Sequence, residues 1–542
     1  MRSTRRRFLA SSGLASAGLL VPGRSVLARI PGAREPAPSS APPSGGHAHA
    51  ALADSALLKD EKLALHALDA ARKKGASFAD VRLVLWRREN LGVRDDHISR
   101  ISRSEEYGIG LRVIADGAWG FAATNLLDRT HVNRVVDQAI ATAKVNAKLL
   151  KRPVQWAPAP AVLGTWVSPY EVDPFTVPLQ EKADLLIQAA RGALGVKGVR
   201  FVRAGVRVLR EEKLYINSEG SRLHQMYFRL NPSLSATAVD RRRGGFASRD
   251  HEGQPMLGGW EHVAESRLIE DAPQIGADAV IKLHAASVEP GTKDVILLPS
   301  NLWLTIHESI GHPTELDRAL GLEANFAGTS FITPDQTGKL QLGSERVNLV
   351  ADRTQPGGLA TTGWDDDGVA SQRWDMVKNG RFVGWQTTRD QAGWIGEAAS
   401  RGCSYGDSYG SVAFQRMPNI SLQPGPEGYT TEDLINATED GIVVSGRGSW
   451  SIDHQRYNFQ FGGQFFWEVK NGRLTRPLKD VAYQANSVDF WRSCDMLGGA
   501  DTYRLGASFS DGKGEPGQSN GVSHGCPPAR FRVNILNTGE QE

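Results

Sequence analysis

The apolar residues in the first half of the chain repeat with two alternating periods. A helical period, with apolar residues three and four positions apart, predicts helices at residues 55–75, 129–150, 178–194 and 260–283. A period of two predicts strands at residues 81–85, 91–98, 108–114, 201–209 and 214–217, with further strands up to residue 239. A helix followed by a hairpin therefore occurs twice, which suggests two related αββ units.

The pattern changes after Pro290. Glycine becomes frequent, apolar runs become short, and Asn-Gly or Asp-Gly turn signals appear at residues 378–380, 439–441 and 470–472. Such dipeptides between short strands are typical of tight hairpin turns. We therefore predict an α+β fold. Its N-terminal α/β half spans residues 55–290 with the repeated helix–hairpin units. Its C-terminal, mostly antiparallel β half spans residues 291–542 and carries one important helix at its start.

The N-terminus has the features of an export signal. Residues Thr4-Arg5-Arg6-Arg7-Phe8-Leu9 contain a twin arginine, and a mildly apolar stretch and a possible cleavage site follow, at residues 10–21 and 26–28. The apolar stretch is about half the length of a membrane span. We expect a twin-arginine (Tat) signal peptide at residues 1–28, a periplasmic or other extracytoplasmic location, and no stable membrane insertion. Residues 29–54, rich in Pro, Ala, Ser and Gly, are expected to form a disordered linker.

Composition limits the classes of function. The 542 residues are 40% hydrophobic and 23% charged, as in an ordinary globular protein with about two to four structural units. The net charge of +3 is small and no basic stripe alternates with aromatic residues, so the sequence indicates no nucleic acid partner. Cys403, Cys494 and Cys526 allow one disulfide, and because they form no CxxC pair, a zinc site made of cysteines alone is excluded.

The segment with the clearest chemistry is His307-Glu308-x-x-x-His312. It lies on a predicted helix that follows the buried strand 295–298 and has Ser300 as its N-cap. Neutral imidazoles suit Zn²⁺, and an adjacent carboxylate can accept a proton from a metal-bound water. Histidines five positions apart lie about 140° apart on a regular helix, whereas a π-bulge would bring them within about 50°. Gly311 and Pro313 make such an irregularity less costly. The alternative is two unrelated histidines on an ordinary helix.

The residues around this segment carry a family resemblance. The stretch from His307 to Asp317, HESIGHPTELD, resembles the signature of the TldD/PmbA family of metallopeptidases. Other blocks resemble the family in the same order along the chain, at residues 108–121, 366–368, 416–419, 462–464 and 512–514. The resemblance extends over the chain from about residue 55 onward.

The resemblance implies a zinc peptidase that hydrolyses small or unfolded peptides inside a chamber formed by a dimer. It implies that His307 and His312 bind zinc, that Glu308 is the general base, and that a cysteine directly before a Gly-Lys pair is the third ligand. PmbA-type subunits lack the histidine motif, so this chain resembles the catalytic TldD branch. Its partner would be either a second copy of itself or a PmbA-like subunit.

The third ligand is where the chain departs from the family, because Asp511 precedes the Gly-Lys pair here. A carboxylate is an ordinary zinc ligand, and it resists the oxidants that attack a thiolate outside the cytoplasm. We hypothesise that Asp511 is the third ligand, with Cys526, His524 or an incomplete site as alternatives. A degenerate site would make the chain a non-catalytic peptide-binding or assembly subunit. A third interpretation is a non-proteolytic amidohydrolase.

Two pairs of polar residues are further candidates for the site. Glu315 and Asp317 are placed to orient an imidazole. His454 and Tyr457, in the polar segment 453–457, are candidates to stabilise an oxyanion, although a structural role is the simpler interpretation.

Three other polar segments have a simple and a functional interpretation. Residues 365–367 (Asp-Asp-Asp) are interpreted as a solvated acidic turn, with a cation site as the alternative. Residues 405–409 either line a substrate groove or form an ordinary loop. Lys513 is expected at the surface, with an electrophilic role as the alternative.

Overall fold

In the computed structural model, which describes residues 52–53, 55–242 and 244–539, the N-terminal half is built on one sheet of long strands. The predicted signal peptide and nearly all of the predicted linker lie outside the described residues. In chain order the elements of this half are η2 (Ala56–Lys59), α3 (Glu61–Lys73), β1 (Phe78–Arg94), β2 (His97–Ala115), β3 (Ala118–Thr124), α4 (Arg129–Ala147), β4 (Leu163–Val167), α5 (Leu179–Leu194), β5 (Val199–Asn217), β6 (Arg222–Val239), β7 (Phe246–Asp250), β8 (Met256–Leu257), α6 (Glu261–Glu265) and α7 (Leu268–Leu283).

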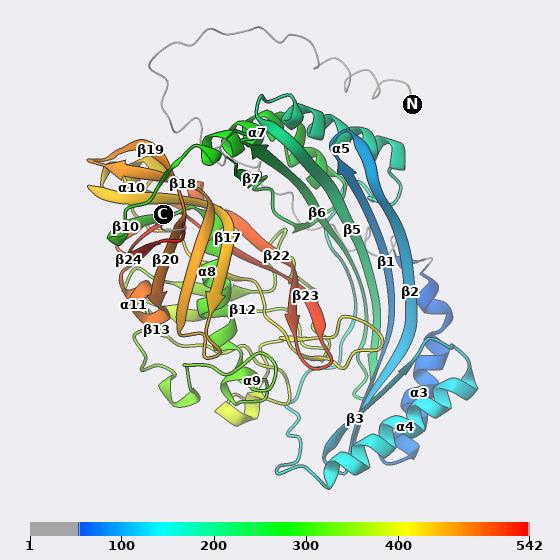
Figure 1. The fold of residues 1–542 in the computed structure, drawn as a ribbon. Coiled ribbons are helices and arrows are strands. Elements are labelled where there is room, and N and C mark those ends of the chain that lie inside the picture. The colour runs from blue at the N-terminus through cyan, green and yellow to red at the C-terminus, as the bar shows by residue number, and fades with distance from the viewer. Residues whose placement is uncertain (1–51, 54, 243, 540–542) are drawn as a thin grey trace. The chain divides into compact units, whose positions relative to one another are not determined.

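The strand order β3-β2-β1-β5-β6-β4 places two hairpins side by side, and β7 and β8 pair with β6. Each hairpin, β1–β2 and β5–β6, follows a helix, α3 or α5, and β1 pairs with β5 antiparallel (Figure 1). The predicted repeat of helix and hairpin is therefore confirmed.

The strands are longer than the sequence predicts. β1 runs through the polar residues between the two strands expected at 81–85 and 91–98, and β5 runs through those between 201–209 and 214–217. These polar residues continue the strands because they are paired inside the molecule. Glu89 is buried against Lys182, and Glu211 is buried against Lys213 at 2.9 Å and Arg229.

The sheet is covered on both faces where β1 begins. Val81 and Leu83 belong to a core shared with α3 and α4, whereas the alternating Arg82 contacts Asp366 of the C-terminal half. The helix predicted at 260–283 is divided into α6 and α7, since Arg267 between them has a left-handed backbone with φ of 59°.

The C-terminal half contains short helices and more sheet. Its elements are β9 (Ala286–Ser287), β10 (Gly291–Leu297), α8 (Pro299–Ile306), η3 (His307–Gly311), η4 (His312–Thr314), α9 (Leu316–Ala319), η5 (Pro334–Gln336), β11 (Leu349–Asp352), β12 (Arg373–Lys378), β13 (Arg381–Phe382), η6 (Ala392–Ile395), β14 (Ser404–Tyr405), β15 (Phe414–Gln415), β16 (Ile420–Leu422), α10 (Thr431–Asn436), β17 (Asp440–Ile452), β18 (Asn458–Lys470), β19 (Arg473–Lys479), β20 (Val481–Asn486), α11 (Ser487–Arg492), β21 (Met496–Leu497), η7 (Ala500–Thr502), β22 (Arg504–Lys513), β23 (Gln518–Cys526) and β24 (Ala529–Asn537).

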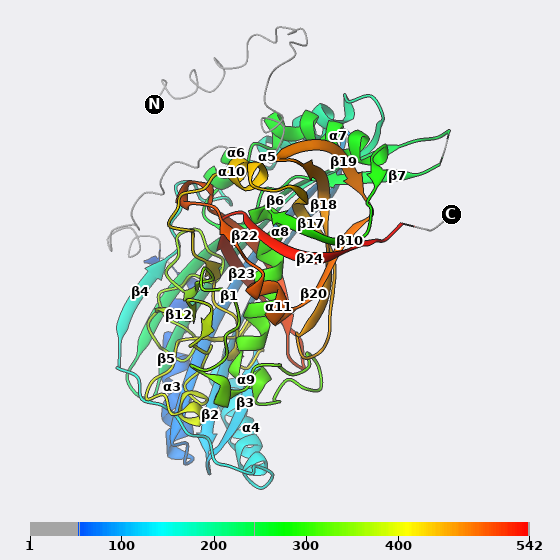
Figure 2. The same ribbon diagram turned by 90° about the vertical axis from the view of Figure 1, so that its left-hand side faces the viewer.

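The main sheet of this half has the order β17-β10-β24-β20-β18-β19-β9, and an extra pairing between β17 and β18 closes part of it into a ring. Phe459, Phe461 and Tyr483 pack in its core beside Phe531. The helix α8 packs against β17, β22 and β23 (Figure 2). The predicted β-rich half with a helix at its start is therefore confirmed, and the overall α+β class with it.

The cysteines form no disulfide in this structure. Cys403, Cys494 and Cys526 are all buried and free. Among the described residues, none of the helices has the length and apolar character needed to cross a membrane.

Candidate metal centre

The histidine segment lies on a helix that changes its pitch. Pro299 is the first residue of α8 and Leu298 is its N-cap, so the predicted cap Ser300 was wrong by two positions; its hydroxyl instead accepts from the Gly446 N–H at 3.0 Å. Proline suits the first helical position, where an N–H would lack a partner.

A π-helical turn, η3, continues α8 over His307–Gly311. The N–H of His312 donates to the carbonyl of His307, which is the five-residue bond of a π-helix. The two imidazole centroids are 4.6 Å apart as a result. The distortion that the sequence predicted is confirmed.

Close packing holds the π-helical turn in place. A Cβ added at Gly311 would lie 2.5 Å from Sδ of Met417, so no larger side chain fits there without movement. The hydroxyl of Ser309 donates to the Thr305 carbonyl at 2.6 Å and accepts from Nε1 of Trp491 at 2.9 Å. The turn is thus fixed from both sides.

The protons on His307 are determined by a chain of hydrogen bonds. Nδ1 of His524 lies 2.8 Å from the Ile420 carbonyl, which can only accept, so this nitrogen carries the proton in a neutral ring. Nε2 of His524 then accepts from Nδ1 of His307, at 2.8 Å. The remaining nitrogen of His307, Nε2, is the one that can bind a metal.

His312 is oriented in the same way by a carboxylate. Its Nδ1 lies 3.0 Å from Oε2 of Glu315, which accepts the ring proton. Arg318 and Lys513 contact Glu315, at 3.0 Å and 3.3 Å. Asp317 contacts Lys513 instead of an imidazole, so only the first of the two predicted orienting carboxylates contacts a histidine.

Asp511 faces both free ring nitrogens. Its Oδ1 lies 3.3 Å from Nε2 of His307 and 3.7 Å from Nε2 of His312, while its Oδ2 accepts from Arg416 at 3.2 Å. The register between β22 and β23 shifts between Ser508 and Asp511. Such a bulge changes the direction of the side chains beside it, and bulges are frequent at active sites.

Glu308 completes the group. It is buried beside the two histidines, and ligand atoms of His307, Glu308 and His312 all lie within 4.8 Å of one another. Arg456 donates from Nη1 to Oε2 of Glu308. Arg456 has φ of 64°, a left-handed conformation that costs a non-glycine residue about 1–2 kcal/mol, so the fold holds it there against its own preference.

The electrostatics of the site favour a cation between the rings and Asp511. Burial and the Arg456 charge lower the pKa of His312 to about 4, and burial with the nearby His307 lowers the pKa of His524 well below its usual value. Burial also lowers the pKa of His307, but Asp511 outweighs it, and the net shift is upward. Burial raises the pKa of Asp511, but the two histidines and Arg416 outweigh it and hold it far below its usual range.

These residues suit a zinc ion chemically. Two neutral imidazole nitrogens and one carboxylate oxygen form the three-ligand set typical of catalytic zinc, which keeps its fourth position open. The outer partners His524 and Glu315 are those expected of metal-binding histidines, which donate their second ring proton to an acceptor.

Family models match almost the whole described chain. The PmbA/TldA metallopeptidase domain 1 matches residues 79–143, the central domain matches residues 172–286, and the C-terminal domain matches residues 290–535. The chain belongs to the PmbA/TldD metallopeptidase family.

Relatives of this PmbA/TldD chain carry metalloprotease names. It is 27% identical to a metalloprotease of Methanothermobacter thermautotrophicus, over 84% of this chain and 94% of the relative. It is 21% identical to a zinc metalloprotease TldD homolog of Saccharolobus solfataricus, over 84% and 96% of the two chains. The solved structure of TldE from Thermococcus kodakarensis has the same fold, with a TM-score of 0.62 at 17% identity over 88% of this chain and 100% of TldE.

The other candidates for the third ligand lie differently in this PmbA/TldD structure. Cys526 is buried, its Sγ lies 3.9 Å from the Pro299 carbonyl, and burial raises the pKa of its thiol far above the usual value. A thiol held protonated in this way is a poor metal ligand. His524 is at the site, but its Nε2 lies against His307.

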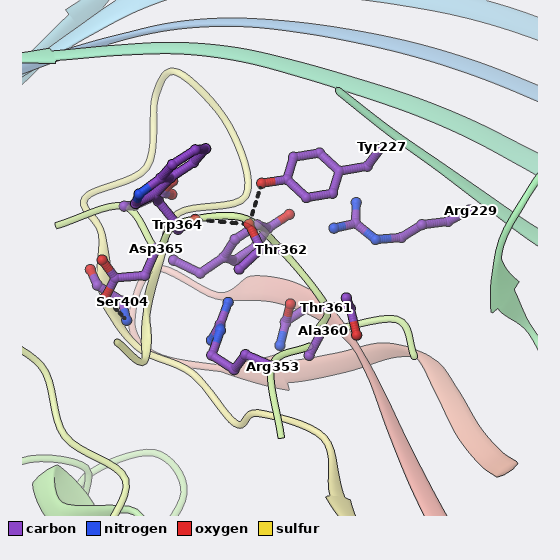
Figure 3. Close-up of a pocket in the computed structure, with 12 residues that line it drawn as sticks. Tyr227, Arg229, Arg353, Ala360, Thr361, Thr362, Trp364, Asp365 and Ser404 are labelled. Atoms are coloured by element: carbon purple, nitrogen blue, oxygen red, sulfur yellow. Dashed lines mark hydrogen bonds between the residues drawn. The ribbon is translucent and has the colours of Figure 1, made fainter. Parts of the chain in front are cut away.

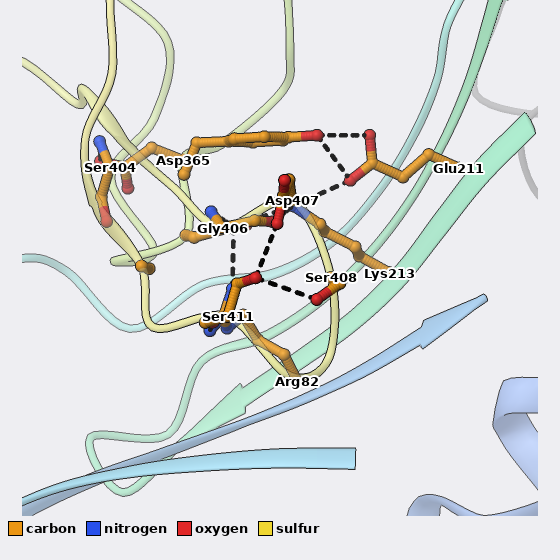
Figure 4. Close-up of polar contacts among 12 residues, drawn as sticks. Arg82, Glu211, Lys213, Asp365, Ser404, Gly406, Asp407, Ser408 and Ser411 are labelled. Atoms are coloured by element: carbon orange, nitrogen blue, oxygen red, sulfur yellow. Dashed lines mark hydrogen bonds and ion pairs between the residues drawn. The ribbon is translucent and has the colours of Figure 1, made fainter. Parts of the chain in front are cut away.

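The acidic segment 365–367 is not a solvated turn. All three aspartates are buried, and Asp366 and Asp367 contact cations of the N-terminal sheet, among them Arg82 and Lys213 (Figure 4). Asp366 pairs with Lys213 at 2.8 Å and Arg82 at 3.3 Å, and Asp367 pairs with Arg112 at 2.7 Å. The sequence prediction was wrong because these cations lie more than 150 positions earlier in the chain. The cavity beside Asp365 measures about 10 Å³, room for about one water molecule (Figure 3).

The loop 405–409 packs on the same sheet. The Tyr405 hydroxyl donates to Glu211 at 3.0 Å, and the Tyr409 ring lies directly over Gly108, where any Cβ would come within 2.5 Å of it. Lys513, expected at the surface, is fully buried among Glu315, Asp317 and Gln415.

Sequence reasoning missed two functional contacts. In the polar segment 453–457 it named His454 and Tyr457, whereas Arg456 is the residue that contacts Glu308, and Tyr457 packs against Phe331. His524 was considered only as a ligand, and its place behind His307 follows from the pairing of β22 with β23. No local pattern marks either residue.

Proposed function

We propose that this chain is a zinc-dependent metallopeptidase in which His307, His312 and Asp511 hold the metal and Glu308 is the general base. The proposal is carried by one observation. Nε2 of both histidines, each left free by a hydrogen bond on the other ring nitrogen, faces the same carboxylate oxygen of Asp511.

The metal and the protein side chains would have different roles in the reaction. Bound Zn²⁺ supplies Lewis acidity toward the scissile carbonyl and lowers the pKa of a water beside it. Glu308 accepts the proton of the attacking water and passes it to the leaving amine nitrogen. Arg456 orients Glu308, because its guanidinium donates directly to that carboxylate. His524 and Glu315 fix the two imidazoles.

Asp511 is preferred as third ligand on chemical grounds. It is ionised, it has an oxygen directed at both histidines, and its other oxygen is held by Arg416. Cys526 would have to leave a buried position beside Pro299 and lose a proton.

We further propose small or unfolded peptides as substrates, Tat-dependent export, and a dimer, either of this chain or with a PmbA-like subunit. These proposals rest on the family resemblance and on the N-terminal sequence.

The test combines metal analysis with product identification. Purified mature protein is assayed for zinc by mass spectrometry, and a peptide library is incubated with wild type and with Glu308→Gln. We expect about one zinc per chain in both proteins and a loss of about 10²–10⁴-fold in cleavage by the variant, which is the usual contribution of a general base. Glu270→Gln, an exposed carboxylate on α7, is the matched control and should cleave like wild type.

Two outcomes would overturn the proposal. If the protein binds no zinc when one equivalent is supplied, the proposed metal site is wrong. Bound zinc with no cleavage above the level of Glu308→Gln would favour the non-catalytic peptide-binding or assembly subunit, which the replacement of the family cysteine by Asp511 makes the second candidate.

A further inference from the structure

A cavity of about 590 Å³ lies next to the metal centre, between β5 and β6 on one side and α8, β17 and β22 on the other. Trp303 lines it, and the Trp303 ring centroid is 6.5 Å from that of His307. Ser510, which directly precedes Asp511, lines it as well. A peptide bound at the metal would therefore extend into this cavity within about two residues, since an extended chain advances about 3.3 Å per residue.

The cavity is rich in arginine. Two carboxylates, Asp250 and Glu252, line it against four arginines: Arg203, Arg207, Arg249 and Arg447. Glu252 is already paired with Arg249, and Asp250 accepts from Gln464 at 3.3 Å. The positive charges therefore exceed the acidic groups available to neutralise them.

Two donors beside the cavity, one on Arg249 and one on Trp303, have no partner within the described part of the chain. Arg249 is fully buried, and its Nη1 makes no hydrogen bond there. Nε1 of Trp303, which is 2% exposed, makes none either. Buried donors are almost always bonded. Neither atom has surface open to the cavity, so each would need a side-chain movement to reach a ligand there.

Two of the other arginines are held in place by aromatic rings. The Arg447 guanidinium lies 4.3 Å from the Trp450 ring and forms no ion pair with any residue that the structure describes. Arg207 lies 4.4 Å from the Phe509 ring and donates to Ser510 at 3.2 Å. Stacking of this kind fixes a guanidinium and leaves its N–H edge free to bind a carboxylate.

Arg207 and Arg447 are exposed, but neighbouring atoms remove part of the water around their guanidinium groups. This partial desolvation lowers the pKa of Arg207, with the nearby Arg100 contributing, and lowers the pKa of Arg447. A carboxylate in the cavity would relieve this cost through charge-assisted hydrogen bonds, which are about twice as strong as neutral ones.

We propose that this arginine-lined cavity is a substrate subsite that selects peptides carrying a carboxylate close to the scissile bond. The inference rests on the proposed peptidase function. The carboxylate comes either from an Asp or Glu side chain or from the C-terminus of the peptide, and both present the same acceptor to the arginines.

The test uses matched peptides. Cleavage is measured for peptides that differ only by Glu or Gln at each position within four residues of the cleaved bond, each with a free or an amidated C-terminus. We expect kcat/KM to be about 10-fold or more higher for the carboxylate-bearing member, the value of one charge-assisted hydrogen bond. A preference for internal Glu identifies the side chain as the source, and a preference for the free acid identifies the C-terminus.

Variants of the cavity arginines test whether the preference for acidic peptides arises in the cavity. In Arg447→Gln and Arg207→Gln the ratio between acidic and neutral peptides should fall toward one. Arg72→Gln removes an equal charge from a side chain that is 75% exposed on α3, and its ratio should match wild type. Equal cleavage of acidic and neutral peptides by wild type would overturn the inference, and so would a ratio that both cavity variants leave unchanged.

A peptide-binding assay distinguishes a failure of this inference from a failure of the peptidase proposal. The same peptides, labelled with a fluorophore, are titrated into Glu308→Gln, where turnover is not required. Tighter binding of acidic peptides together with no cleavage by wild type would support the subsite and overturn the peptidase. Cleavage without any acidic preference in either assay would support the peptidase and overturn the subsite.

Discussion

Two clusters of buried charged residues, one around Asp511 and one around Asp366, both contain aspartates, but these aspartates face different partners. Around Asp366, two of the three aspartates at 365–367 contact a lysine or arginine of the other half of the chain. Around Asp511 the facing groups are the Nε2 nitrogens of two histidines, His307 and His312.

This difference in partners distinguishes a cluster with a structural role from a cluster that can bind a metal. Permanent cations neutralise Asp366 and Asp367, and backbone N–H groups bond Asp365, so that cluster joins the two halves of the chain. Histidines can exchange a proton for a metal ion, so the same kind of carboxylate becomes a candidate ligand beside them. Acidic clusters are therefore better judged by their partners than by their composition.

The largest effect should follow from removing the proposed third ligand. Asp511→Ala should reduce zinc affinity by more than about 100-fold, beyond the loss that an outer partner causes, and cleavage should fall to background. Zinc content after dialysis and the rate of peptide cleavage measure both. Asp511→Cys restores the ligand type that the family resemblance implies and should keep the metal. Full zinc occupancy in Asp511→Ala would reject Asp511 as a ligand.

A substitution in the cluster around Asp366 should lower the stability of the fold. Asp366→Ala leaves Arg82 without its carboxylate and Lys213 with only Glu211, and breaking a buried pair costs about 3–5 kcal/mol in the free energy of unfolding. Urea unfolding measures this, and zinc content of the folded protein should not change. Asp495→Ala breaks the ion pair with Arg530, in which Asp495 is the more exposed member. It should lower the free energy of unfolding by about 1 kcal/mol or less. Equal losses in the two variants would contradict a structural role for the buried cluster.

A smaller effect is expected at His524, which orients a ligand without binding metal itself. His524→Leu keeps most of the volume and removes the acceptor for His307, so zinc affinity or activity should fall by about 10–100-fold. His524→Gln places a carbonyl oxygen at a similar reach and should recover part of the loss. If both variants lose zinc as completely as Asp511→Ala, His524 is itself a ligand.

The smallest effect concerns Asp365, which differs from its neighbours because it accepts only backbone N–H groups, from Asp367, Val369 and Ser404. Burial, with the nearby Asp367 charge, raises its pKa from 3.8 to about 7. The folded state therefore binds more protons than the unfolded state between these values, and stability falls as pH rises through them.

Asp365→Asn removes this titration. The stability of the variant relative to wild type should rise between about pH 4 and pH 7, as measured by urea unfolding across that range. A difference that does not depend on pH would show that Asp365 stays ionised throughout.

Much of the fold was predictable because it depends on local periodicity. The helices α3, α4 and α5 and the two hairpins follow from apolar spacing, and the π-helical turn follows from the five-residue spacing of His307 and His312. The strands β1 and β5 were predicted too short, since polar residues such as Glu89 and Glu211 interrupt the apolar pattern. Each of these two carboxylates is buried against a cation of another element, Lys182 of α5 or Arg229 of β6.

By itself the sequence determined the two helix–hairpin units, the β-rich second half, the helix that carries His307, Glu308 and His312, and the distortion of that helix, since all of these arise among residues close together in the chain. Only the tertiary structure decided which carboxylates meet cations and which meet histidines. His524 lies 217 positions from His307, and Asp366 lies 153 positions from Lys213. Partners at such distances are brought together by the packing of sheets, which no local pattern encodes.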